Sequence, residues 1–171
     1  MRCGRALLVA VATLLAGCTG IPEGVVPVRD FRLNAYLGKW YEIARLDHSF
    51  ERGLEQVTAD YSLREDGGLR VVNRGYSRAS GEWKEAVGKA YFAGDPEQGH
   101  LRVSFFGPFY SSYVIFELDP DYRYAFVSGY DTSYLWLLAR TPDVEPEVLA
   151  RFKSLSASLG FAVDQLILVD Q

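Results

Sequence analysis

Apolar and polar residues alternate, or apolar residues run in short blocks, through positions 39–140, and turn signals separate the runs. The cleanest alternation is the stretch 101–105 (LRVSF), which would give a strand one apolar face and one wet face. Asp66-Gly67-Gly68 is typical of a hairpin turn. The pattern predicts eight strands, over residues 39–46, 56–64, 69–78, 83–93, 100–106, 112–118, 122–130 and 134–140.

After Arg140 the spacing of apolar residues changes to that of a helix. One stripe is formed by Val148, Phe152, Leu155 and Leu159. The start and end signals of this helix are a cap at Asp143, an early proline at Pro146 and a stop at Gly160. A last strand is expected over residues 165–169.

Strands that recur every 8–15 residues with short turns indicate an antiparallel meander, which is a sandwich or a barrel. We predict an all-β fold, an eight-stranded antiparallel up-and-down barrel with one C-terminal α-helix packed on its wall. Eight strands are just enough to hold one small ligand inside.

Composition limits the classes of function. The chain has 171 residues, 49% of them hydrophobic and 14% aromatic, with a formal net charge of −4, which indicates a single globular domain. Eighteen basic residues against 22 acidic ones leave no basic surface for nucleic acid. No apolar run reaches the roughly 20 residues of a membrane-spanning helix. Two cysteines are too few for a disulfide framework.

The N-terminus has the pattern of a secretory signal. Arg2 and Arg5 precede ten uncharged residues, 6–15 (ALLVAVATLL), and small residues follow in Leu15-Ala16-Gly17-Cys18. This last tetrapeptide resembles the bacterial lipobox. The resemblance implies that Cys18 receives a diacylglycerol, that the chain is cut before it, and that the new amino group is acylated. The alternative is a soluble secreted protein in which Cys18 is incidental.

We therefore divide the chain into a lipoprotein signal peptide (1–17), a lipidated cysteine with a tether (18–30) and one folded domain (31–171). Thr19, which follows the cysteine, implies by the bacterial sorting rule an outer-membrane location, and we expect the domain to face the periplasm. Cleavage would remove two arginines and no acids, so 16 basic residues against 22 acidic ones would leave a net charge of −6. The remaining cysteine would be lipidated, which leaves no disulfide and no cysteine nucleophile.

Three motifs fall in order on the expected elements. Residues 38–45 (GKWYEIAR) open the first strand, residues 118–122 (LDPDY) lie between two strands, and Arg140 ends the eighth. These motifs resemble those of the lipocalins, in the form that bacterial outer-membrane lipocalins share with apolipoprotein D. Residues 51–55 (ERGLE) and 104–109 (SFFGPF) also resemble this subgroup. The second motif departs from the family in having Leu118 where a threonine is usual, and the disulfides of many animal lipocalins are absent.

The resemblance implies a structural motif and a function. The motif residues are Gly38, Trp40, Asp119 and Arg140. We expect Trp40 to plug the closed end of the barrel and Arg140 to lie over its ring in a cation–π contact while reaching backbone carbonyls. Residues 31–37 would cross beneath as a short helical lid. The implied function is to bind, store or transport fatty acids or phospholipids, including lysophospholipids, in the cell envelope, with no cofactor.

Strand parity predicts the lining of a pocket. We expect small residues such as Ala59, Gly88 and Ala90 to leave room for an acyl chain, although small barrels are sometimes filled by their own side chains. Trp40 pointing inward would also bring Glu42 and Ala44 inward, and Glu42 would orient a ligand head group or join a structural network. The predicted pocket residues are Glu42, Ala59, Tyr61, Val71, Asn73, Ala90, Val103, Phe105, Tyr113, Ile115, Trp136 and Leu138.

The sequence offers no catalytic constellation. There is no G-x-S-x-G elbow, and the two histidines, His48 and His100, stand near strand ends, where we expect solvated side chains. We therefore predict no enzyme, no metal and no cofactor. The alternatives are a lipocalin-fold enzyme or tetrapyrrole binder and a filled-barrel structural protein of the envelope. A homodimer is a candidate assembly. The aromatic run 105–110 is either an exposed patch at the rim or a plug.

Overall fold

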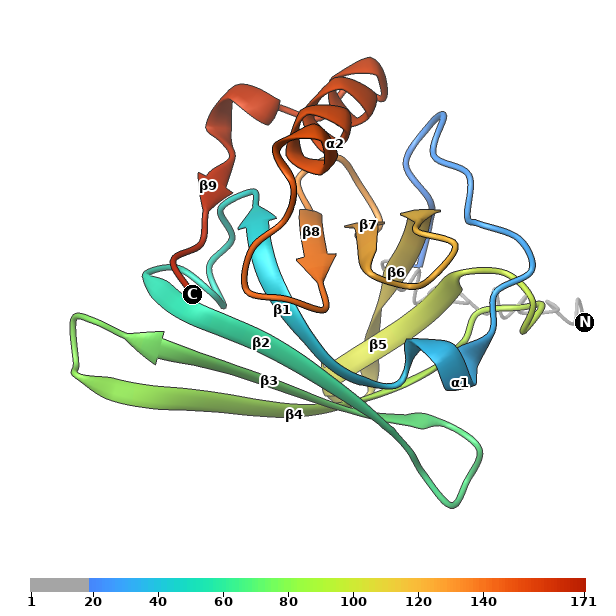
Figure 1. The fold of residues 1–171 in the computed structure, drawn as a ribbon. Coiled ribbons are helices and arrows are strands. Elements are labelled where there is room, and N and C mark those ends of the chain that lie inside the picture. The colour runs from blue at the N-terminus through green and yellow to red at the C-terminus, as the bar shows by residue number, and fades with distance from the viewer. Residues whose placement is uncertain (1–18) are drawn as a thin grey trace, which may run out of the picture.

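The computed structural model describes residues 19–171, so the predicted signal peptide and Cys18 lie outside the described residues. Figure 1 shows a strongly curved sheet with one long helix against its outer side. The elements in order are α1 (Leu33–Tyr36), β1 (Gly38–Arg45), β2 (Leu54–Leu63), β3 (Leu69–Ser77), β4 (Glu82–Phe92), β5 (His100–Phe106), β6 (Phe109–Leu118), β7 (Tyr124–Ser128), β8 (Leu135–Ala139), α2 (Pro146–Ser158), a 3-10 turn (Val163–Gln165) and β9 (Ile167–Leu168).

Consecutive strands pair in antiparallel fashion from β2 to β8, and β1 then pairs with both β8 and β2. The second pairing closes the sheet on itself, with Trp40 opposite Ala59. The prediction of a closed eight-stranded up-and-down barrel is therefore confirmed. The ninth strand, β9, is only two residues long and pairs with Ala44 and Arg45 of β1, beyond the stretch where β1 pairs with β2, so the last strand is shorter than expected.

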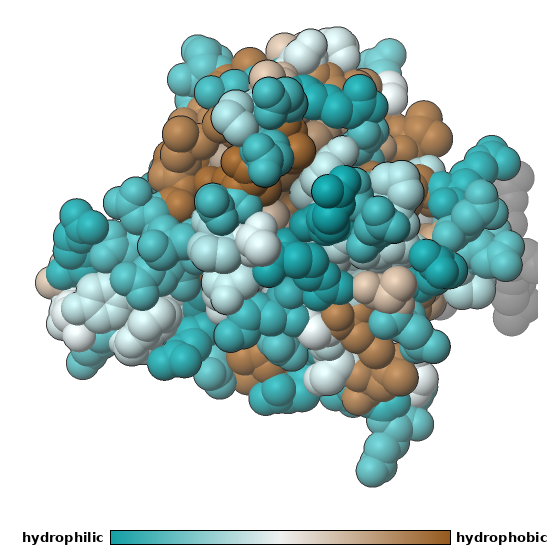
Figure 2. All heavy atoms as spheres, in the orientation of Figure 1, coloured by the Kyte–Doolittle hydropathy of each residue, from teal (hydrophilic) through white to brown (hydrophobic). Residues whose placement is uncertain are grey.

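The helix α2 packs on the barrel wall as its apolar stripe predicts. Phe152 is fully buried, and the other members of the stripe pack against a cluster that includes Phe126, Leu135 and Leu137. In Figure 2 hydrophilic side chains cover most of the visible face, and apolar ones gather beneath α2. A second cluster, which includes Phe31, Tyr36 and Trp40, lies inside the barrel, on the opposite face of the sheet.

The helix begins later than the sequence indicates. Asp143 is not its cap: the N-cap is Glu145, whose side chain makes no capping hydrogen bond. Pro146 explains the shift, because its fixed φ suits the first helical position and its missing N–H is not needed there. Gly160 lies just beyond the end with a φ of 86°, a conformation that favours glycine, so the predicted stop is confirmed.

Strand parity fails once in β1. The pairing of β1 with β8 shifts register between Glu42 and Ala44. Ala44 therefore belongs to the cluster beneath α2, and Arg45 is the residue that reaches the Glu42 carboxylate. The expectation that Ala44 points inward is wrong, because a bulge changes which residues face the interior. Among residues 19–171 no helix is long and apolar enough to cross a membrane.

Candidate functional site

The barrel holds a cavity of about 680 Å³. Phe50, Phe106, Phe109 and Tyr130 all line it. Phe50 and Tyr130 come from the β1–β2 and β7–β8 connections, and Phe106 and Phe109 are the last residue of β5 and the first of β6. The mouth of the cavity therefore lies at this end of the barrel. The expectation of an open rather than a filled barrel is confirmed, and the volume falls within the roughly 300–1,000 Å³ of small-molecule sites.

Eleven of the twelve predicted pocket residues line this cavity. They are Glu42, Ala59, Tyr61, Val71, Asn73, Ala90, Val103, Phe105, Tyr113, Trp136 and Leu138. The twelfth, Ile115, is fully buried in the packed core instead. Gly88 does not provide the expected room either, since the ring of Phe105 lies 2.8 Å from the position that a Cβ would take there.

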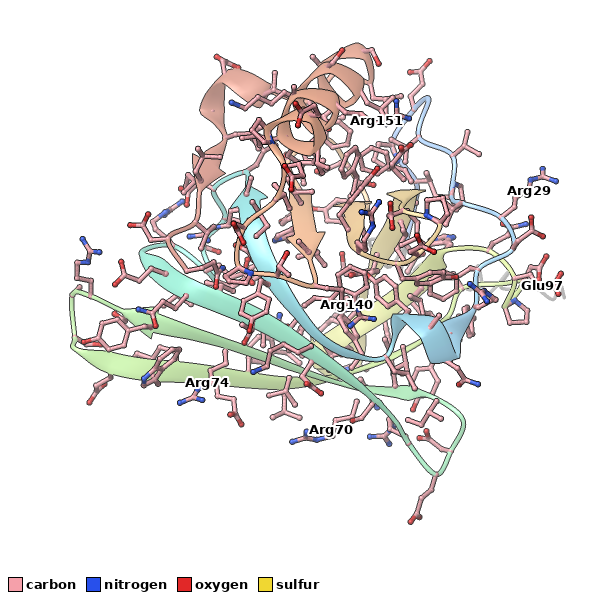
Figure 3. The ribbon with its side chains drawn as sticks, viewed as in Figure 1. Arg29, Arg70, Arg74, Glu97, Arg140 and Arg151 are labelled. Carbon is pink, nitrogen blue, oxygen red and sulfur yellow. The ribbon has the colours of Figure 1, made fainter. Side chains whose placement is uncertain are left out.

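The structural motif closes the opposite end. Trp40 is fully buried and its indole N–H donates to the Tyr36 carbonyl at 2.8 Å. The guanidinium of Arg140 lies 3.9 Å from the centre of the Trp40 ring, which is the cation–π contact that the sequence predicts. Arg140 also donates to the carbonyls of Ala35, Lys39 and Tyr122. In Figure 3 it lies between the end of β8 and α1, whereas Arg70 of β3 points outward.

The other two motif residues shape the backbone at this end. Gly38 has a φ of 90°, which disfavours any side chain, and the Arg140 guanidinium lies 3.6 Å from where a Cβ would stand. The buried carboxylate of Asp119 accepts hydrogen bonds from the Arg123 guanidinium and from the N–H groups of Asp121 and Arg123. These bonds, with Arg123 the main cause, lower the pKa of Asp119.

Three tyrosine hydroxyls form a hydrogen-bonded chain between the packed core and the cavity. Tyr61 donates to Tyr113 at 2.9 Å, and Tyr36 and Tyr113 are 2.6 Å apart. Burial raises the pKa of all three phenols, so they stay protonated at neutral pH. Three hydroxyl hydrogens serve two bonds, which leaves one O–H to donate to a further acceptor.

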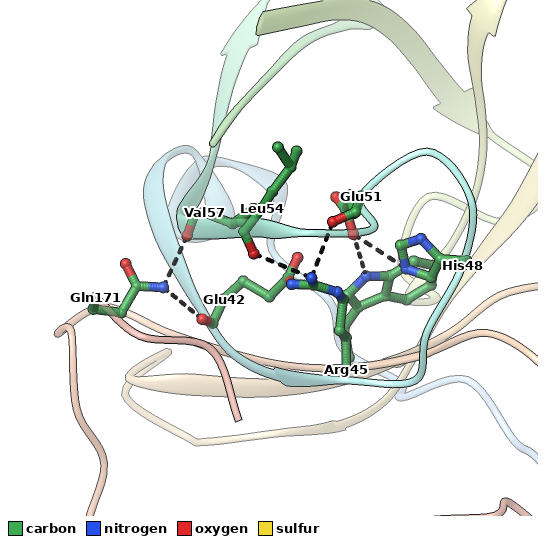
Figure 4. A network of polar contacts seen from close by, with 8 residues as sticks. Glu42, Arg45, His48, Glu51, Leu54, Val57 and Gln171 are labelled. Carbon is green, nitrogen blue, oxygen red and sulfur yellow. Dashed lines mark hydrogen bonds and ion pairs between the residues drawn. The ribbon is translucent and has the colours of Figure 1, made fainter. Parts of the chain in front are cut away.

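A buried ionic network lies on the β1 side of the cavity (Figure 4). The Arg45 guanidinium donates to the Glu42 carboxylate at 2.7 Å and to the carbonyls of Glu51 and Leu54. The Glu51 carboxylate accepts from the Trp136 indole N–H at 3.1 Å and lies 3.1 Å from His48 Nε2. Glu42 and Glu51 both line the cavity, and the charged residues Arg74, Lys84 and Glu85 of the β3–β4 hairpin line it as well.

The two carboxylates titrate in opposite directions. Loss of hydration on burial, together with the nearby Glu51, raises the pKa of Glu42 despite its bond to Arg45. The pKa of Glu51 is lowered: burial is the largest single influence and acts upward, but the bonds from His48 and Trp136 and the charge of Arg45 together outweigh it. An anionic ligand group would therefore meet an ionised carboxylate at Glu51.

The histidines differ from the sequence expectation. His48 is 6% exposed and stacks on Phe50, with ring centres 4.0 Å apart, so the prediction of a solvated His48 is wrong. Its side chain lies against Glu51 rather than among the residues that line the cavity. His100 is partly buried, and its Nε2 lies 3.1 Å from the Ser112 hydroxyl. Within residues 19–171 no three His, Cys, Asp or Glu side chains gather to hold a metal.

Sequence reasoning missed the cavity residues that come from loops. Strand parity says nothing about a loop, so Phe50 and Glu51 of the β1–β2 connection and Tyr130 and Tyr134 of the β7–β8 connection were not expected in the pocket. The only signal for the first pair is the resemblance of residues 51–55 to the bacterial subgroup.

The model of the lipocalin-like domain matches residues 31–171. The chain belongs to the lipocalin family. This lipocalin is 62% identical over 165 residues to outer membrane lipoprotein Blc of Vibrio cholerae, with 96% of each chain covered. It is 51% identical over 169 residues to outer membrane lipoprotein Blc of Escherichia coli K12, again with 96% of each covered. These relatives support a location at the bacterial outer membrane.

More distant relatives agree with the fold. Apolipoprotein D of Bos taurus is 34% identical over 175 residues, which covers 92% of this lipocalin and 91% of the relative. Insecticyanin from the tobacco hornworm superposes with a TM-score of 0.71 at 23% identity, covering 89% of this lipocalin and 87% of that chain. Lobster apocrustacyanin A1 gives a TM-score of 0.65 at 19% identity, covering 88% and 93% of the two chains. These two structures bear on the fold alone.

Proposed function

We propose that this lipocalin binds fatty acids or lysophospholipids in its barrel, and that it stores or carries them at the outer membrane on the periplasmic side. The acyl chain lies in the cavity and the head group stays at the mouth. A lipid on Cys18 holds the domain at the membrane. Residues 19–30 were expected to form a tether, but this segment packs along the barrel, with Val25 buried and Val28 hydrogen-bonded to Ile115. The protein acts as a binding protein, with no covalent step.

The observation that carries this proposal is the apolar lining of most of the cavity, with charged side chains confined to the Glu42–Glu51 network and the β3–β4 hairpin. Small and apolar residues, among them Ala59, Val71, Ala90 and Leu138, line most of it. Each methylene that leaves water for such a wall contributes about 0.8 kcal/mol. A chain of a dozen methylenes therefore gains enough free energy to offset the cost of ordering it.

The buried carboxylates favour a ligand orientation in which the acyl chain enters the cavity and the head group stays at the mouth. An acid or phosphate group placed deep in the cavity would lose its hydration beside the ionised Glu51, and this arrangement is unfavourable. At the mouth the same group keeps its hydration. The tail-first orientation thus satisfies both the apolar walls and the buried network without a new unpaired charge.

Native mass spectrometry of the full chain carrying Cys18→Ser, followed by titration with palmitate and lysophosphatidylethanolamine, tests the proposal. We expect one lipid per barrel, with saturable binding. Ala90→Trp, which places a large ring in the cavity, should weaken binding at least about tenfold. Ala93→Trp is the matched control, because Ala93 is exposed just beyond the end of β4 and its replacement should leave binding unchanged.

Circular dichroism and thermal unfolding establish that both tryptophan variants fold. If the unmodified barrel takes up neither lipid, the proposal is wrong. Equal binding by the Ala90→Trp and Ala93→Trp proteins would place the lipid outside the barrel and contradict it as well.

A further inference from the structure

The mouth of the barrel exposes large aromatic side chains. Phe106 and Phe109 are 80% and 72% exposed, and they pair across the β5–β6 hairpin. Phe50 of the β1–β2 connection is 56% exposed. All three line the same mouth as Tyr130, and we call these four residues the rim aromatics.

At the closed end of the barrel the aromatic residues are buried instead of exposed. Phe31, Tyr36 and Tyr122 are buried there, and the large apolar side chain exposed at that end is Leu63, beside the β2–β3 turn. Exposed phenylalanine costs solubility, and clusters of such residues mark protein or membrane contact. The rim aromatics therefore indicate that something covers the mouth.

The path of the N-terminal segment shows which surface lies near. Three backbone hydrogen bonds hold it along the barrel: Val28 N–H to the Ile115 carbonyl, Gly99 N–H to Val28, and Phe31 N–H to Glu97. Followed backwards, the segment reaches the other end, where a Cβ on Gly20 would lie 3.9 Å from the Tyr130 carbonyl. The described chain thus begins beside a rim aromatic.

One peptide bond joins Thr19 to Cys18, a step of about 3.8 Å between Cα atoms. A lipid on Cys18 would therefore be attached at the mouth end of the barrel, not at the closed end. This short connection leaves the domain little freedom to turn its mouth away from the bilayer.

Basic side chains flank the rim aromatics. Lys89 of β4 and Arg102 of β5 both lie 5.8 Å from the centre of the Tyr110 ring, which itself lines the mouth. An apolar tip with tyrosine and cations behind it is the arrangement that suits the acyl boundary and phosphate layer of a membrane.

We propose that the rim aromatics dock the mouth of the barrel onto the lipid bilayer that holds the anchor. A lipid then passes between the membrane and the cavity without crossing water. The inference goes beyond the proposed function but rests on it for the lipid on Cys18, and the experiments below separate the two.

The first experiment locates the loop. The full chain contains two cysteines, Cys3 in the predicted signal and Cys18, so an added cysteine is the one free thiol of the acylated protein. Phe106→Cys and the matched control Leu63→Cys each receive an environment-sensitive fluorophore in vesicles that carry a lipid-borne quencher. We expect strong quenching at position 106 and little at position 63. Equal quenching at both positions, or none at 106, would overturn the proposal.

The second experiment removes the anchor. The chain with Cys18→Ser is mixed with vesicles of phosphatidylethanolamine and phosphatidylglycerol, and sedimentation measures the bound fraction. We expect that adding Phe106→Ser and Phe109→Ser weakens binding at least about tenfold, because two apolar side chains no longer leave water. Adding Leu63→Ser instead should leave binding unchanged.

The outcomes are distinguishable from failure of the proposed function. The loss of vesicle binding between the Cys18→Ser chain and the same chain with Phe106→Ser and Phe109→Ser reads the rim, because residues 1–17 are present in both. Palmitate titration of the Cys18→Ser chain reads the cavity. If Phe106→Ser and Phe109→Ser convert a dimer into a monomer in light scattering but leave vesicle binding unchanged, the mouth is an interface between two copies and membrane docking is wrong.

Discussion

The two ends of this barrel are built from the same strands and used in opposite ways. At the closed end Arg140 alone ties three segments together, through the carbonyls of Ala35, Lys39 and Tyr122. Aromatic rings fill the space between them, with Tyr36 and Trp40 4.6 Å apart. At the mouth the strands separate around a cavity, and aromatic rings point into solvent.

The mouth is therefore held by polar contacts in place of a packed core. β1 and β2 pair directly only from Gly38 to Tyr41. Beyond that, the C-terminal segment bridges them: Gln56 N–H donates to the Asp170 carbonyl, and the Gln171 side chain donates to the carbonyls of Glu42 and Val57 (Figure 4). The comparison shows that the barrel is closed by side-chain packing at its closed end and by hydrogen bonds at its mouth, where the cavity leaves no packed core.

The largest effect should come from breaking the closed end. Trp40→Ala removes a fully buried indole, its hydrogen bond and the ring beneath Arg140. We expect the free energy of unfolding to fall by about 5 kcal/mol, the upper part of the range for such truncations. Urea unfolding followed by far-ultraviolet circular dichroism measures this loss.

Trp83→Ala is the matched control at the mouth side. Trp83 is 46% exposed and contacts Tyr76 and Arg74 on the β3–β4 hairpin. Its truncation should cost less than about 1 kcal/mol. Comparable losses for the two tryptophans would contradict the view that packing is concentrated at the closed end.

A smaller loss in the free energy of unfolding is expected when the buried ionic network around Arg45 is broken. Arg45→Met leaves the buried Glu42 carboxylate without its cation and the carbonyls of Glu51 and Leu54 without this donor. We expect the free energy of unfolding to fall by about 3 kcal/mol. Hydrogen exchange should accelerate at Gln56 and Val169 near the mouth while the Arg140 amide at the closed end stays protected.

The double variant Glu42→Gln with Arg45→Met sharpens this result. Removing both charges removes the unpaired carboxylate, so the double variant should be more stable than Arg45→Met alone. A double variant no more stable than the single one would mean that Arg45 acts through its carbonyl bonds and not through the ion pair.

The same contrast explains what could be predicted from the sequence. Strand positions follow from the alternation of apolar and polar residues, because side chains repeat with the strand period. The closed end was expected from the resemblance of the motifs around Trp40, Asp119 and Arg140 to those of the lipocalins. The bulge after Glu42, the buried His48 and the late start of α2 could not be foreseen. The first two depend on tertiary contacts, namely the pairing with β8 and the Glu51 carboxylate, whereas the start of α2 is set locally by Pro146 at its first position.

The smallest effect is expected from pH, because a change of pH leaves every packing contact in place. The pKa of Glu42 lies above its ordinary value of 4.5, so from that pH up to its raised pKa the folded protein holds a proton that the unfolded chain releases. This contribution to stability is present below pH 4.5 and is lost as the pH rises through the raised pKa. The lowered pKa values of Glu51 and Asp119 act in the opposite direction, but only below their ordinary values of 4.5 and 3.8.

Glu42→Gln should therefore remove a decline in stability that the unmodified protein shows above pH 4.5. Burial lowers the pKa of His100 from 6.5, which makes stability rise with pH just below that value, but this contribution is present in both proteins and cancels in their difference. Urea midpoints measured at intervals from pH 4.5 to 8 give that difference directly. If the two proteins keep a constant difference across this range, the proton on Glu42 does not contribute, and the network at the mouth is held by the Arg45 hydrogen bonds alone.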